Sequence, residues 1–145
     1  MTTTTRFIAS TIAVFALGFT LGQVFDNGMT ANAQSGKVFE LRTYIAPEGK
    51  LPNLLTRFND HTMRIFEKHG MVNVGYWVPQ DAPASANTLV YILSHDSRAA
   101  AEKSWAAFRE DQEWARIAEE SQLDGRIVSS VESVFLEATG FSPMQ

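Results

Sequence analysis

The spacing of hydrophobic side chains switches between two periods along this chain, and the order of the switches limits its fold more than any other feature. From Val38 to Ile45, successive side chains alternate between two faces, which is the two-residue period of a β-strand. From Leu51 to Phe66, apolar residues instead recur at helical spacing, within an arc of about 140° at 100° per residue. Two more strands are predicted over Val72–Val78 and Thr88–His95, joined by a hairpin loop.

Residues that start and stop helices agree with this order. Gly70 suits the end of the first helix, and Ser97 suits the N-cap of the second. Asp111 suits the cap of another helical piece that ends near Gln122, and the last strand is predicted over Arg126–Glu137. The resulting order, β-α-β-β-α-β, predicts an α+β, ferredoxin-like fold: a four-stranded antiparallel sheet with helices on one face.

The two middle strands carry apolar side chains on both faces. A sheet with one face in water normally alternates apolar and polar residues more cleanly. We therefore expect the face without helices to pack against the same face of a second copy, giving a homodimer.

Five short segments, in one order, resemble the NIPSNAP family: Glu40-Leu41-Arg42-Thr43-Tyr44, His61, Gly75-Tyr76-Trp77, Leu89-Val90-Tyr91-Ile92-Leu93 and Asp111-Gln112-Glu113-Trp114. The resemblance covers residues 38–141 and implies a ferredoxin-like domain that pairs into a dimeric α+β barrel. Relatives of this fold commonly bind ligands between the helices and the sheet. Cofactorless oxygenases and isomerases share the barrel, and some family members are associated with trafficking and membrane-linked complexes.

Residues 1–33 have the three parts of a secretory signal peptide. Arg6 is followed by an apolar stretch and then by small residues before an expected cleavage after Ala33, with 34–37 as a linker. Residues 7–25 would alternatively form a helix of about 28 Å, close to the roughly 30 Å hydrocarbon core, so an uncleaved membrane anchor is the other interpretation. Arg6 favours an inside N-terminus, which predicts a secreted or periplasmic domain, or an anchored domain on the extracytoplasmic side.

Charge and histidine spacing exclude several classes of function. The chain has 12 basic and 16 acidic residues, and the basic ones are dispersed, so no nucleic-acid partner is expected. The absence of cysteine excludes thiolate metal sites and a cysteine nucleophile. His61 and His69 would lie about 12 Å apart on a helix, too far to share an ion. We therefore expect no metal and no cofactor, haem included, and structural roles for His69 and His95.

Glu40, Arg42 and Tyr44 project together from the first predicted strand. One interpretation makes Arg42 an anion ligand with Tyr44 as a donor beside it, both lining a ligand pocket. The other is a polar ladder or ion pair across the dimer interface that fixes its register.

His61 lies at the edge of the apolar helical arc, where it is expected to face the space between helix and sheet. It is a candidate general base or hydrogen-bond donor to a ligand, or else a paired histidine of the scaffold. Tyr76, Trp77 and Trp114 would suit a flat apolar ligand in the same cavity, although aromatic residues also fill cores.

These features predict an exported NIPSNAP-like protein that binds a small aromatic or apolar molecule, with six ligand-binding candidates: Arg42, Tyr44, His61, Tyr76, Trp77 and Trp114. Two alternatives stay open at this point. One is a cofactorless oxygenase or isomerase, and the other is a structural or interaction protein associated with membranes or trafficking.

Overall fold

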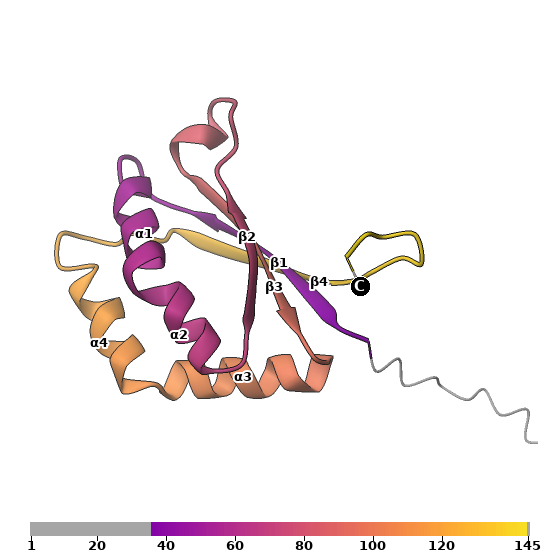
Figure 1. Cartoon of the computed structure of the whole chain (residues 1–145). Helices are drawn as coiled ribbons and strands as arrows, with labels where there is room; N and C mark the ends of the chain where they lie inside the picture. Colours follow the sequence, from indigo (N-terminus) through magenta and orange to yellow (C-terminus); the bar gives the residue numbers. More distant parts are fainter. Residues whose placement is uncertain (1–35, 145) are drawn as a thin grey trace, which may run out of the picture. The chain divides into compact units, whose positions relative to one another are not determined.

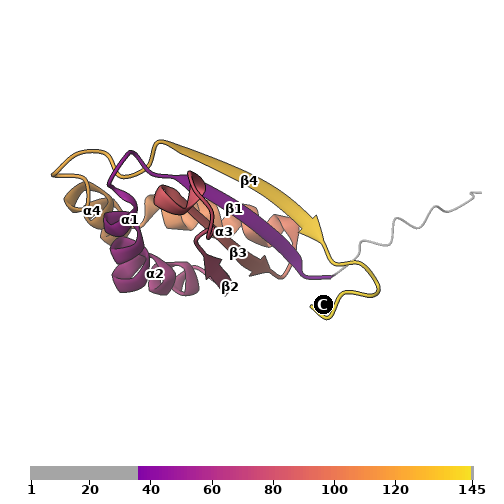
Figure 2. The ribbon, with the colours of Figure 1, turned by 90° about the horizontal axis from the view of Figure 1, so that it is seen from above.

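The computed structural model describes residues 36–144, which form a four-stranded antiparallel sheet and its helices (Figure 1). The strands are β1 (Val38–Ile45), β2 (Val72–Trp77), β3 (Thr88–His95) and β4 (Ser130–Glu137). They lie in the order β2-β3-β1-β4, with β2 and β4 at opposite edges (Figure 2). This arrangement confirms the predicted ferredoxin-like order.

The first predicted helix is one helical run with an irregular middle. It consists of α1 (Leu51–Arg57), a π-helical turn η1 (Phe58–Thr62) and α2 (Met63–Lys68). It ends at Gly70, whose φ of +75° is the left-handed conformation that stops a helix. The sequence pattern predicted the length of this run but not the π-helical turn inside it.

The second helical region contains α3 (Arg98–Glu110) and α4 (Gln112–Glu120), and both begin as predicted. The Ser97 hydroxyl accepts a hydrogen bond from the Ala100 N–H, and the Asp111 carboxylate accepts from two N–H groups in the first turn of α4. The last strand starts four residues later than predicted. Residues 126–129 turn instead, and the Arg126 guanidinium donates to the backbone carbonyls of Val128 and Ser129.

The helices pack on the sheet face that carries Tyr44 and Tyr91. Eight rings from the sheet and the helices form one aromatic cluster, with neighbouring centroids 4.5–6.1 Å apart: Tyr44, Phe58, Phe66, Tyr76, Tyr91, Trp105, Phe108 and Trp114. Tyr91 and Phe66 lie fully buried at its centre. Rings of this size supply most of the apolar area in such a core, and here they fill the space between helices and sheet.

The opposite face of the sheet, the open face, is apolar as well. Leu41 on β1 lies between Ile92 on β3 and Val134 on β4, and all three side chains point away from the aromatic cluster. Val134 is 44% exposed and Leu136 is 39% exposed. The open face therefore has the apolar character that the sequence predicted, without a helix from residues 36–144 to cover it.

Gly75 shapes one part of the open face. It lies two residues before Trp77 on the same side of β2, and a Cβ at Gly75 would be only 2.5 Å from Cη2 of the Trp77 indole. A larger residue at this position would displace the ring. The Gly75-Tyr76-Trp77 segment thus places one ring flat on the open face and the Tyr76 ring in the aromatic cluster.

The predicted signal peptide or anchor lies outside the described residues. Among residues 36–144, no helix combines the length and the apolar character needed to cross a bilayer.

Candidate ligand groove

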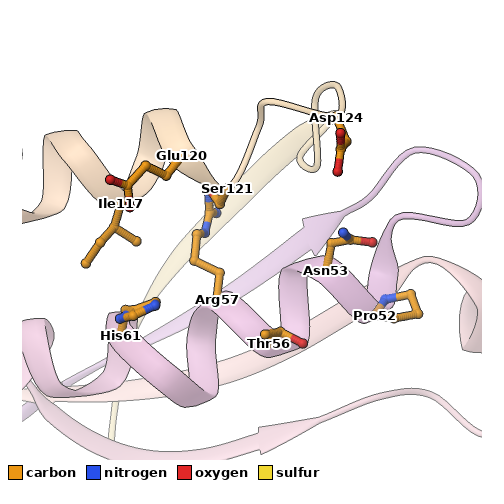
Figure 3. A pocket seen from close by; sticks show the side chains of 9 residues that line it. All are labelled: Pro52, Asn53, Thr56, Arg57, His61, Ile117, Glu120, Ser121 and Asp124. Atoms are coloured by element: carbon orange, nitrogen blue, oxygen red, sulfur yellow. The ribbon is translucent and has the colours of Figure 1, made fainter.

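A groove of about 440 Å³ separates α1 from α4 (Figure 3). Its lining combines apolar, hydroxyl, amide, imidazole and charged side chains: Pro52, Asn53, Thr56, Arg57, His61, Ile117, Glu120, Ser121 and Asp124. We call this feature the α1–α4 groove. It lies within the helical layer, whereas the sequence predicted a cavity between the helices and the sheet.

The π-helical turn sets the direction of His61. At the end of the turn, the Met63 N–H bonds to the Phe58 carbonyl, five residues back. The Thr62 hydroxyl donates to the Arg57 carbonyl at 3.1 Å, which satisfies an acceptor inside the widened turn. Such turns are often found at functional sites. The extra residue in the turn leaves His61 exposed, on the side that faces α4 (Figure 3).

The predicted orientation of His61 toward the sheet is therefore wrong. A regular helix would hold this side chain next to the apolar arc, and the widened turn rotates it out. His61 makes no hydrogen bond or ion pair with any residue in 36–144, so its ring is available to a ligand.

Arg57 lies one turn before His61 and is 6% exposed. Its Nη1 donates to the Ser121 hydroxyl at 3.4 Å, while Nε has no partner among the described residues. The guanidinium lies 5.1 Å from the centroid of the Trp114 ring. Burial lowers the pKa of Arg57, and the nearby phenols of Tyr44 and Tyr91 only partly offset this. With a pKa normally above 12, the group still stays charged.

Arg57 was not among the predicted site residues. In a regular helix it lies about 60° from Leu54, just outside the apolar arc. A basic residue at that edge, one turn from His61, was the only signal in the sequence. An arginine in this position usually extends into solvent, which is why the pattern alone did not identify it.

Arg42, the predicted anion ligand, already has an anionic partner. Its Nη1 donates to Glu40 at 2.6 Å, and its guanidinium lies 4.2 Å from the centroid of the Trp105 ring. Both side chains are on the helix-covered face of β1. The alternative prediction was an ion pair across a dimer interface. It is wrong, because Arg42 and Glu40 form their ion pair within one chain.

Glu40 is the centre of a buried hydrogen-bond network. It is 1% exposed and accepts hydrogen bonds from four side chains: Arg42, Ser133, His95 and Trp105. Burial alone would raise the pKa of Glu40, but these four donors outweigh it and lower the pKa from 4.5 to about 2. The network links β1, β3, β4 and α3, so its role is to stabilise the fold.

The other predicted ligand residues do not share a cavity. Tyr44, Tyr76 and Trp114 belong to the aromatic cluster, where Tyr76 stacks on Tyr91 at 5.2 Å and Trp114 packs on Phe108 at 4.5 Å. Trp77 lies on the open face and is 51% exposed. Of the six predicted residues, only His61 lines the α1–α4 groove.

The remaining histidines are paired within the chain. His69 lies 2.6 Å from the Asp111 carboxylate, which also accepts from Lys68 at 2.7 Å. His95 is fully buried beside Glu40. In residues 36–144, no group of three or more histidine, aspartate or glutamate side chains is placed to hold a metal ion.

The sheet order and the two helical regions define a ferredoxin-like α+β domain. The family model described as NIPSNAP matches residues 39–143. The chain therefore belongs to the NIPSNAP family, as its sequence motifs predicted. No curated protein matches it.

Solved structures give the same result for the fold. A NIPSNAP family protein of unknown function from Agrobacterium tumefaciens is 23% identical with a TM-score of 0.66, covering 77% of this chain and 96% of that one. An uncharacterised NIPSNAP-like domain protein from Burkholderia xenovorans is 16% identical with a TM-score of 0.65, covering 75% and 90%. SnoaB, a cofactor-independent oxygenase from Streptomyces nogalater, is 14% identical with a TM-score of 0.51, covering 74% and 98%. At these identities the likeness concerns the fold alone.

Proposed function

We propose that this NIPSNAP protein binds a small aromatic or apolar organic molecule in the α1–α4 groove. The observation that carries the proposal is the groove itself, because it reaches a histidine with no partner in the described chain. Pro52 and Ile117 supply apolar surface, while His61 and Ser121 supply polar groups that would orient a ligand. A few polar groups in a partly apolar concavity are typical of small-molecule sites.

Replacing His61 with leucine tests this role. The imidazole has no partner to lose, so His61→Leu should change the free energy of unfolding by no more than about 0.5 kcal/mol. Ligand retained by the purified protein should fall about 10-fold, the usual effect of losing one hydrogen bond worth about 1.4 kcal/mol. Native mass spectrometry measures the occupancy, and urea denaturation of the same sample measures the stability.

Asp60→Asn provides the matched control, because Asp60 is exposed beside His61 but does not line the groove. It should leave occupancy and stability unchanged. A destabilised His61→Leu protein with full occupancy would instead assign His61 to the scaffold.

We also infer that the open face pairs two copies of the chain. The pairing is supported by the apolar surface around Ile92 and Val134. Removing this surface from water would stabilise a dimer by about 25 cal/mol per Å². Two copies of one chain present the same open face to each other, as a two-fold interface requires.

Export of the domain rests on the leader sequence. The mature protein is expected to begin at Gln34, because Ala31 and Ala33 supply the small side chains that precede a signal peptidase site. The intact mass of the protein recovered from its producing cells should match residues 34–145. Recovery of the full-length chain in the membrane fraction would instead establish the uncleaved anchor.

A further inference from the structure

The charged side chains buried in residues 36–144 are compensated, with one exception. Glu40 pairs with Arg42 and His95, and Asp111 pairs with Lys68 and His69. Arg57 forms no ion pair with any described residue, although it is more than nine-tenths buried. A buried charge without a counter-charge is costly, so such a group usually has an opposite charge close by.

No carboxylate among residues 36–144 forms an ion pair with the guanidinium, and the only negative feature beside it is the partial charge at the C-terminal end of α4, at Ser121. The neighbours of the guanidinium are the Trp114 ring, the phenols of Tyr44 and Tyr91, and the Ser121 hydroxyl at 3.4 Å. The Trp114 ring attracts the cation but carries no net charge that would balance it. Nε has no acceptor, and the one hydrogen bond from Nη1 is long.

Arg57 lines the α1–α4 groove, where its side chain extends from α1 toward Ser121 at the end of α4 (Figure 3). Two carboxylates also line the groove, and both are exposed. Glu120 pairs with Arg116 at 2.8 Å. Asp124 is near Lys50, whose Nζ donates to its backbone carbonyl at 2.7 Å. The one buried charge in the lining is therefore positive.

We propose that the α1–α4 groove takes an organic monocarboxylate, whose oxygens accept hydrogen bonds from Arg57 and whose body packs against Ile117 and Pro52. This inference rests on the proposed function and specifies its ligand class. A planar guanidinium matches the geometry of a carboxylate. A single unpaired cation balances one negative charge. The exposed carboxylates of Glu120 and Asp124 would repel an anion of higher charge, such as phosphate, more strongly.

The test compares acids with neutral molecules of the same shape. Benzoate and indole-3-acetate are titrated into the full-length protein beside benzamide and indole-3-acetamide, with binding followed through the NMR signals of His61 and by calorimetry. Each acid should bind about 10-fold or more tightly than its amide, because a charge-assisted pair is worth about 1.4 kcal/mol or more.

Arg57→Met removes the charge and keeps much of the side-chain volume. The preference for acids should disappear, while the melting temperature stays the same or rises, because an unpaired buried charge has been removed. Arg57→Lys should keep part of the preference. Arg116→Met is the matched control, since it removes one positive charge from an exposed residue of α4 that pairs with Glu120 and does not itself line the groove, and it should change the affinity for acids less than about 2-fold.

Each result decides between the two proposals. Equal binding of acids and amides at His61 would overturn the carboxylate inference and leave the ligand groove standing. No binding of any of the four probes would count against the groove itself. An Arg57→Met protein that is less stable yet still prefers acids would show that Arg57 is a scaffold residue. If that variant does not fold, the acid and amide titrations of the wild-type protein still give the answer.

Discussion

Glu40→Gln should lower the free energy of unfolding by about 3 kcal/mol, a large part of the stability of a domain of this size. The carboxylate accepts from Arg42, His95, Trp105 and Ser133, with distances of 2.6–3.1 Å. An amide has one oxygen, and its NH2 group would face donors. The Arg42 charge would also lose its counter-ion. Urea denaturation of both proteins at neutral pH measures the difference.

The contribution of Glu40 to stability depends on pH. The pKa of Glu40 is lowered in the folded state from 4.5 to about 2. A lowered pKa means that the stabilisation is complete above pH 4.5 and is lost as the pH falls toward 2. The difference in unfolding free energy between wild type and Glu40→Gln should therefore shrink over this range.

Glu102→Gln is the control for this experiment. Glu102 is an exposed acid on α3, 3.6 Å from Arg98, and its loss should cost less than about 0.5 kcal/mol. A Glu40→Gln protein as stable as this control would contradict the role of the network. So would a stability difference that stays constant as the pH falls.

Ile92→Lys should prevent the proposed pairing of two copies through the open face and leave a folded monomer. Ile92 is on the open face of a central strand, opposite Leu41. A two-fold interface would bury two such lysines without partners, so the dissociation constant should rise about 100-fold or more. The monomer itself should stay folded, because the lysine then reaches water. Light scattering at micromolar concentration gives the mass, and circular dichroism checks the fold.

Ala107→Lys places the same charge at an exposed position on α3 and should remain dimeric. A wild-type protein that is monomeric at micromolar concentration would contradict the dimer proposal. A dimeric Ile92→Lys protein would show that the two copies pair through another surface.

The order of the elements and most of their ends could be predicted from the sequence because they depend on local patterns; the start of β4 could not. The two-residue period from Val38 to Ile45 predicted the bounds of β1 as they occur in the structure. Ser97 and Asp111 were recognised as N-caps, since a cap acts on N–H groups two or three residues away. The apolar character of both sheet faces was also visible in the sequence.

The candidate site depended on the tertiary structure. The alternation in β1 separated Glu40 and Arg42 from Leu41, but it did not say which set the helices cover. The π-helical turn redirected His61 because one extra residue in a turn rotates every side chain that follows, and apolar periodicity does not report it.

Arg57 became significant only through residues far along the chain. Its guanidinium donates to Ser121, 64 positions away, and Glu40 accepts from Trp105 across 65 positions. The sequence determined which segments are strands and helices, because those patterns are set by neighbours within a few residues. Only the tertiary structure decided that Glu40 is paired and Arg57 is not, because burial and charge compensation depend on which distant segments the fold brings together.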